Sequence, residues 1–185
     1  MILSLGNDMD RCAWCGSSKL MIEYHDREWG VPLHNDKKLF EFLILEGAQA
    51  GLAWQTILNR RETYRKAFDN FDLGKIAKYT QKNISSLLKD AGIIRNRLKI
   101  EAAITNAQKF LEIQKEFGSF DKYIWQFVNH KTIKNKFKSL NEIPASTKES
   151  DLMSKDLKKR GFRFVGPTIC YAFMQAVGMV NDHIT

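Results

Sequence analysis

Glu46 is the residue whose position in the sequence most directly suggests chemistry. It follows Leu39 by two helical turns and Phe42 by one, so it falls on the apolar stripe of a helix that Asn35 or Asp36 is expected to cap. Solvent is expected on the other side of this helix, which carries Lys37, Lys38 and Glu41. A buried carboxylate is costly unless it is paired or hydrogen-bonded. We therefore expect Glu46 either to pair with a core cation or to serve a ligand.

The sequence around Glu46 is rich in aromatic residues, namely Trp14, Tyr24, Trp29 and Trp54. Aromatic faces can sandwich a flat heterocycle, and a carboxylate can accept hydrogen bonds from an exocyclic amine or favour a cation. The same residue types at helical spacing also occur in ordinary cores, and a lone Glu often pairs with an Arg. The pattern suggests a heterocycle pocket and leaves the core interpretation open.

A second group of residues has the chemistry of a zinc site. Cys12 and His25 lie near the N-terminus and His183 near the C-terminus, and structural zinc normally takes four Cys or His ligands. Cys15 is a possible local fourth ligand, although the Cys-x-x-Cys spacing also permits redox chemistry. Cys170 lies in an apolar run and is expected to be a small core residue.

The segment 157–174 has the pattern of a helical hairpin that binds a phosphate. A basic helix ends at Gly161, and Gly166 with Pro167 opens the next one. Free backbone N–H groups at such a turn and helix N-terminus attract anions. The basic residues around this turn are Lys158, Lys159, Arg160 and Arg163. An ordinary hairpin with a solvated basic face is the alternative, and the weaker hairpin-like segment 90–97 is expected to be structural.

The elements that position these residues are expected to be helices throughout. Beyond the helix that carries Glu46, apolar spacing predicts helices over 53–68, 84–91, 94–117, 120–129, 151–160 and 167–178. The first of these should have a basic exposed side with Arg60, Arg61, Arg65 and Lys66. The polar segment 131–148 contains Pro144 and is expected to be a surface connection. No alternating run predicts a sheet, so the predicted class is all-α.

Composition limits the possible partners. The chain has 185 residues, 44% of them hydrophobic, which suits one compact domain. A formal charge of +8 favours a polyanionic partner, nucleic acid before an anionic membrane. The three cysteines argue against a disulfide framework. With no leader pattern, and an apolar stretch at 168–180 too short for a bilayer, we expect a cytoplasmic protein.

Several motifs together resemble 3-methyladenine DNA glycosylase I. They are Arg11-Cys-Ala-Trp, Tyr24-His-Asp-Arg-Glu-Trp-Gly-Val-Pro, the segments 45–58, 90–97 and 158–170, and Val180-Asn-Asp-His. The resemblance runs from about Arg11 to the last residue. It implies one glycosylase domain over 1–185 with two closely packed helical lobes and a helix-hairpin-helix at about 151–178. It also implies that zinc pins the N- and C-terminal segments together.

The resemblance implies roles for the residues near Glu46. Glu46 would be the catalytic residue that recognises the methylated adenine, with Trp54 stacking on it and Trp14 and Tyr24 completing the pocket. Gly51 and Leu52 would lie at the DNA surface, Leu52 filling the gap left by a flipped nucleotide.

The resemblance also implies roles for the hairpin and the cysteine and histidine residues. The residues expected to contact the DNA backbone are Lys158, Arg163, Gly166 and Thr168. Cys12, His25 and His183 match three zinc ligands of the family, and the fourth would be a Cys beyond Thr185.

The implied reaction is hydrolysis of the bond between 3-methyladenine and its sugar in double-stranded DNA, by a monomer, after the base is flipped out. Thr168 stands where related strand-cutting glycosylases have a lysine, so no lyase activity is expected. A catalytic Asp of the wider superfamily would fall near Asn181 or Asp182, and Asp182 is also a candidate to orient His183. A non-catalytic helix-hairpin-helix DNA-binding module is the main alternative.

Overall fold

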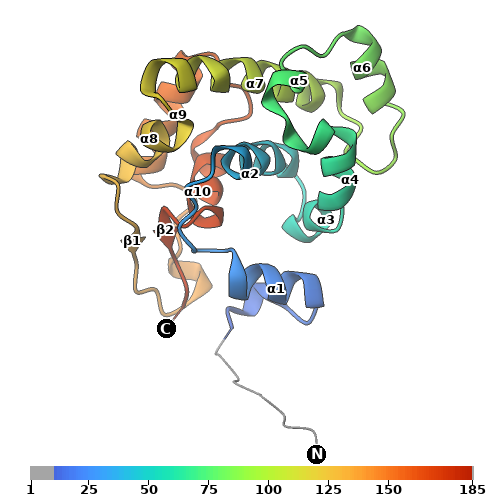
Figure 1. Cartoon of the computed structure of the whole chain (residues 1–185). Coiled ribbons are helices and arrows are strands. Elements are labelled where there is room, and N and C mark those ends of the chain that lie inside the picture. Colours follow the sequence, from blue (N-terminus) through green and yellow to red (C-terminus); the bar gives the residue numbers. More distant parts are fainter. Residues whose placement is uncertain (1–10, 185) are drawn as a thin grey trace, which may run out of the picture.

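The computed structural model describes residues 11–184, and most of them are helical (Figure 1). The α-helices are α1 (Lys19–Arg27), α2 (Asp36–Gln49), α3 (Trp54–Leu58), α4 (Arg61–Ala67), α5 (Leu73–Ile76), α6 (Gln81–Leu87), α7 (Arg97–Phe117), α8 (Phe120–Trp125), α9 (Lys148–Lys159) and α10 (Pro167–Ala176). Short 3-10 helices cover Ala13–Cys15, Asp69–Phe71, Gln126–Val128 and Leu140–Glu142.

Helix α2 is the core of the fold. The side chain of Asn35 accepts a hydrogen bond from the backbone N–H of Lys38 at 3.0 Å, so Asn35 is the cap of the predicted helix. From Leu39 to Ala48 every residue of α2 is buried, because α3, α7, α8 and α10 pack around it. This surrounds Glu46 with protein.

The other helices form two groups on either side of α2 (Figure 1). Helices α3 to α6 lie on one side, while α8, α9 and α10 lie on the other. The long helix α7 runs between the groups and contacts α5, α6, α2 and α8. Helix α1 lies below α2 in the view of Figure 1, on the side of α2 opposite to α7. Helix α7 is therefore a rigid element shared by both groups.

Several predicted helix boundaries need correction, and three of the differences have a clear physical reason. The helix predicted over 53–68 is two helices, α3 and α4, because the chain leaves helical geometry at Arg60 (φ −104°, ψ 0°). The helix predicted from Ile94 begins at Arg97, where Asn96 caps it through a bond from Lys99 N. The helix predicted from Asp151 begins at Lys148, behind a capping box that Thr147 forms.

The predicted exposure of Glu41 and Arg61 was wrong. Both are buried, with 6% and 8% of their surface exposed. Arg61 Nε donates to Glu41 Oε1 at 2.6 Å, and Arg61 Nη1 donates to Glu28 Oε1 at 2.7 Å. A charge can be buried when an opposite charge pairs with it, and spacing along one helix does not reveal a partner from another.

The prediction of no sheet was wrong in one detail. Two-residue strands, β1 (Ile133–Lys134) and β2 (Val180–Asn181), pair in parallel. Strands this short have no alternation to detect. The pairing brings the end of the chain against the connection between α8 and α9. In the part of the chain that the structure describes, no helix is long and apolar enough to cross a membrane.

Candidate active site

A pocket of about 200 Å³ is bounded by α1, α2, α3 and α10. All four residues predicted to bind a base line it: Trp14, Tyr24, Glu46 and Trp54. They come from four elements, since Trp14 belongs to the 3-10 helix Ala13–Cys15, Tyr24 to α1, Glu46 to α2 and Trp54 to α3. The fold thus brings together residues that are up to 40 positions apart, from 14 to 54.

Sequence reasoning missed two amides that line the same pocket. Gln49 follows Glu46 by one helical turn on α2, so its spacing was a usable signal. Gln175 interrupts the apolar run of α10, and its Nε2 donates to Asp182 Oδ2 at 2.8 Å. The remaining wall is formed by Trp29, Ile143 and Ala172.

Glu46 is only 4% exposed, and burial raises its pKa to about 8. At pH 7 the carboxyl of the free protein is therefore protonated by roughly ten to one. A neutral carboxyl can donate one hydrogen bond and accept others. A cation placed beside Glu46 would instead stabilise the carboxylate, so the charge of the pocket can respond to the charge of its ligand.

The aromatic walls contact one another at inclined angles, 68° between Trp14 and Trp29 and 45° between Tyr24 and Trp54. Ring centres are 4.9 Å apart for Trp14 and Trp29, and 5.2 Å apart for Tyr24 and Trp54. Among the described residues, the indole N–H of Trp54 is the one side-chain polar atom that is fully shielded from solvent and has no hydrogen-bond partner. Buried donors are normally satisfied, so this N–H is an exception among the described residues.

The buried ion pairs hold α1 in place beside the pocket. Arg61 of α4 joins Glu28, at the end of α1, to Glu41 of α2. Its guanidinium also lies 4.9 Å from the centre of the Phe42 ring, and that ring is 6.4 Å from Tyr24. The position of Tyr24 in the pocket wall therefore depends on a charge network outside the pocket.

A second hollow, of about 300 Å³, adjoins the pocket and shares Glu46, Gln49 and Ala172 with it. Its other lining residues are Ala50, Gly51, Leu52, Thr168 and Ile169. Gly51 has φ +80°, a conformation that favours glycine, and Leu52 is 40% exposed. This second hollow is called the entrance to the pocket. Three residues predicted to lie at the DNA surface line it, namely Gly51, Leu52 and Thr168.

Helices α9 and α10 pack together as the predicted helical hairpin. At the end of α9, Phe162 N donates to Leu157 O, Gly161 N donates to Lys158 O, and Gly161 has φ +91°. Gly166 precedes Pro167 at the start of α10, and a Cβ at position 166 would meet nothing within 4 Å. The backbone at the start of α10 is therefore open to a ligand.

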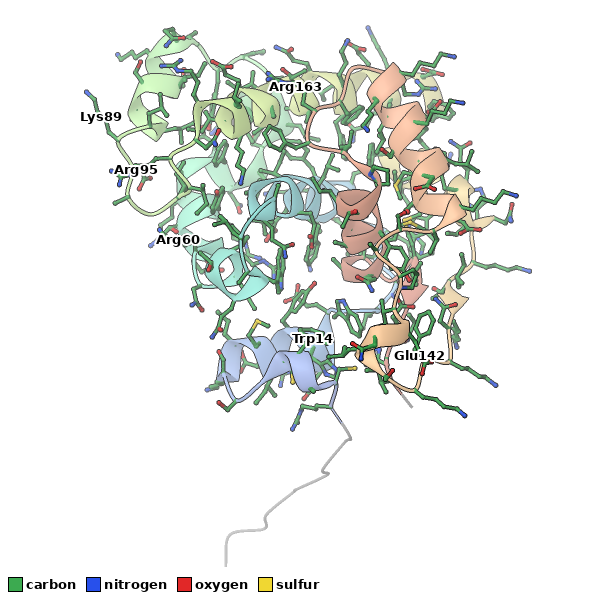
Figure 2. All side chains as sticks on the ribbon, turned by 180° about the vertical axis from the view of Figure 1, so that it is seen from behind. Trp14, Arg60, Lys89, Arg95, Glu142 and Arg163 are labelled. Carbon is green, nitrogen blue, oxygen red and sulfur yellow. The ribbon has the colours of Figure 1, made fainter. Side chains whose placement is uncertain are left out.

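The basic residues of the hairpin divide into two kinds. Lys158 is exposed and Arg163 half-buried, with Arg163 on the turn at the top of the view in Figure 2 and Trp14 at the bottom. Arg160 does not face an anion site, because Glu116 and Asp156 accept its guanidinium hydrogen bonds at 2.7 to 3.2 Å. Lys158 and Arg163, and the exposed Lys159, remain as candidate phosphate contacts.

The predicted metal ligands Cys12, His25 and His183 come close together. The rings of His25 and His183 are 4.7 Å apart, and Ile184 N donates to the thiol sulfur of Cys12 at 3.4 Å. Cys15 is buried nearby, at the end of the 3-10 helix Ala13–Cys15 that follows Cys12. Within residues 11–184, however, no group of three or more His, Cys, Asp or Glu side chains is arranged so that it could hold a metal ion. The predicted fourth ligand, a Cys beyond Thr185, lies outside the described residues.

Asn181, and not Asp182, orients His183. The side chain of Asn181 lies 2.9 Å from Nδ1 of His183. Asp182 is fully buried and accepts hydrogen bonds from Tyr171, Gln175 and Asn135 at 2.6 to 2.8 Å. The predicted role of Asp182 beside His183 was therefore wrong, because its carboxylate points to α10 and the end of β1.

Known proteins resemble this chain over nearly its whole length. Residues 14–185 match the methyladenine glycosylase family. The chain is 52% identical to DNA-3-methyladenine glycosylase 1 of Escherichia coli, over 95% of this chain and 94% of that protein.

Solved structures agree with the sequence match. The fold matches a crystal structure of 3-methyladenine DNA glycosylase I with a TM-score of 0.93 at 50% identity, over 95% of this chain and 96% of that one. It also matches a structure on 3-methyladenine recognition by the Staphylococcus aureus enzyme, with a TM-score of 0.92 at 36% identity, over 96% and 94% of the two chains. The chain belongs to the methyladenine glycosylase family.

Proposed function

We propose that this protein is a monofunctional DNA glycosylase that releases 3-methyladenine from alkylated double-stranded DNA. The observation that carries the proposal is Glu46, buried in an aromatic pocket next to the Leu52 entrance. The named activity of the E. coli relative and the ligand of the S. aureus relative support the same substrate.

Base recognition is assigned to Glu46, Trp14, Tyr24 and Trp54. A purine would stack on the Trp54 ring, because the flat indole face offers it a large apolar surface. Methylation at N3 leaves adenine in DNA with a positive charge. The carboxylate form of Glu46 favours that charge over a neutral base, so Glu46 discriminates damaged from normal adenine and holds the departing base.

The reaction is a hydrolysis. The C1′–N9 bond breaks, its electron pair leaves with the base and neutralises the positive charge, and a water oxygen bonds to C1′ with loss of its proton. Because the cationic base is already a good leaving group, shape and electrostatics can supply much of the catalysis. Thr168 has no amine to form a Schiff base, so the product is an intact strand with an abasic site.

DNA contacts are assigned to the hairpin and to the loop after α2. The open backbone around Gly166 and Thr168, at the N-terminus of α10, can bind a phosphate, with Lys158 and Arg163 beside it. Gly51 and Leu52 lie at the neighbouring entrance, where Leu52 can fill the space of an extruded nucleotide. The protein would act on duplex DNA as a monomer.

We also propose a structural zinc ion, with Cys12, His25 and His183 as its candidate ligands. The donor chemistry supports this proposal, because zinc favours thiolate and imidazole and each His has a side-chain oxygen 2.9 Å from Nδ1. Zinc would join the two ends of the chain and take no part in the reaction. Metal analysis of the purified protein should give about one zinc per chain, and Cys12→Ser should abolish it.

The enzyme proposal is tested by incubating the protein with methylated duplex DNA and identifying free bases by chromatography. We expect 3-methyladenine in the soluble fraction and uncut strands on a denaturing gel. A non-catalytic DNA-binding module would bind the duplex and release no base, and that result would refute the proposal.

A further inference from the structure

The loop that carries Leu52 is held by a lysine from a distant helix. Nζ of Lys99, on α7, donates to the carbonyl oxygens of Ala48 and Ala50, each at 2.8 Å. These carbonyls lie at the C-terminal end of α2, and Ala50 directly precedes Gly51 and Leu52. The loop is also closed on itself, since Leu52 N donates to Gln49 O at 2.6 Å.

The position of Lys99 suits it to this task. A helix C-terminus carries unpaired carbonyl groups and the negative end of the helix dipole, so an ammonium group stabilises it. Lys99 is half-buried, and burial lowers its pKa, so its charge needs these acceptors. An ammonium that donates to two main-chain carbonyls is poorly placed to reach a DNA phosphate as well.

Two helical turns further along α7, Asn106 holds the hairpin turn in the same way. Its Nδ2 donates to Arg163 O at 2.9 Å, and its Oδ1 accepts from Arg163 N at 2.8 Å. Residues seven apart lie on the same face of a helix, about 10 Å apart along its axis. The loop of Leu52 and the hairpin turn are therefore both fixed to one side of one rigid helix.

The two segments also meet directly where α2 passes the hairpin turn. A Cβ on Gly47 would come 3.3 Å from Cβ of Phe164, which has a positive φ of 54°. Lys99, Asn106, Gly47 and Phe164 line one small space of about 10 Å³. Close packing of this kind leaves little freedom for the loop to shift relative to the hairpin.

We propose that Lys99 is a positioning residue that fixes Leu52 relative to the phosphate-binding hairpin, and so supports extrusion of the target nucleotide. This inference rests on the proposed function. Lys99 touches no reacting atom, and its effect should be confined to the step in which a base leaves the stack.

The test compares Lys99→Met with wild type on two substrates. One is a duplex whose single 3-methyladenine faces thymine, and the other carries the lesion opposite an abasic site, where extrusion costs less. Under single-turnover conditions, Lys99→Met should release the base about tenfold more slowly from the first duplex, a loss of about 1.4 kcal/mol in transition-state stabilisation. Release from the second should stay within about twofold of wild type.

Two further variants separate positioning from a general structural role. Lys99→Arg, whose guanidinium can also donate to both carbonyls, should recover most of the rate. In a Leu52→Ala background, Lys99→Met should cause little additional loss, because both changes act on the same step. Lys115→Met, an exposed lysine of the same helix, is the matched control and should behave as wild type.

The other possible results refute either the positioning role of Lys99 or the proposed function. Equal losses on the two duplexes, additive losses with Leu52→Ala, or no loss at all would refute the positioning role while wild type still releases the base. Failure of wild type to release the base from either duplex would instead refute the proposed function.

Discussion

The raised pKa of Glu46 makes a quantitative prediction about stability. In the unfolded chain the carboxyl has a pKa near 4.5, and in the folded pocket it has a pKa of about 8. The folded protein therefore binds the proton more tightly than the unfolded chain does, and this tighter binding stabilises the folded state. The stabilisation is complete below pH 4.5 and is lost as pH rises through 8. A shift of this size corresponds to about 5 kcal/mol, lost at about 1.4 kcal/mol per pH unit.

Glu46→Gln isolates this effect, because glutamine is nearly the same size and does not titrate. The difference in unfolding free energy, wild type minus variant, should fall by about 3 kcal/mol between pH 5.5 and pH 7.5. Urea unfolding at several pH values measures this difference, since the titration of all other groups cancels. Glu23→Gln, at an exposed position on α1, is the matched control for the loss of one carboxyl.

The result that would refute this reasoning is a difference that does not change with pH. It would mean that Glu46 is ionised over the whole range in the folded protein. Burial would then not raise the pKa of Glu46, and the pocket would carry a negative charge without a ligand.

Two other predictions concern residues outside the pocket. Arg61→Met should destabilise the protein by about 3 kcal/mol, because it leaves the buried Glu41 with Arg65 as its remaining partner. Adding Glu41→Gln to this variant should restore part of the lost stability. A double variant that loses the full sum of the two single losses would contradict the pairing of Arg61 with Glu41. Lys158→Ala and Arg163→Ala should each reduce the slope of log binding constant against log salt concentration by about 1, as measured by fluorescence anisotropy on undamaged duplex. The control is the same substitution at Lys82, an exposed lysine of α6. A variant whose slope is as steep as that of wild type would show that the residue does not contact a phosphate.

The parts of the site that lie on one helix were predictable from sequence. Glu46 falls on the apolar stripe that Leu39 and Phe42 mark on α2, and it is buried as this spacing predicts. The hairpin was also predictable, because Gly161, Gly166 and Pro167 mark the end of one helix and the start of the next.

The parts that depend on distant partners were not predictable in this way. Glu41 has the local pattern of an exposed residue, and only the arrival of Arg61 from α4 allows it to be buried. Asn181 and Asp182 are adjacent and chemically similar, so only the fold decides which faces His183. Lys99 bonds to main-chain carbonyls, which carry no side-chain identity and leave no sequence signal.

In the proposed function, Glu46 recognises the damaged base while other parts of the surface bind DNA. This claim is tested most directly by titrating free 3-methyladenine and undamaged duplex into wild type and Glu46→Ala, following the fluorescence of the pocket tryptophans for the base and anisotropy for the duplex. We predict that Glu46→Ala weakens binding of the free base by at least about tenfold, a loss of roughly 1.4 kcal/mol, and leaves binding of undamaged duplex nearly unchanged. Equal losses for the base and the duplex would contradict the claim and remove Glu46 from base recognition.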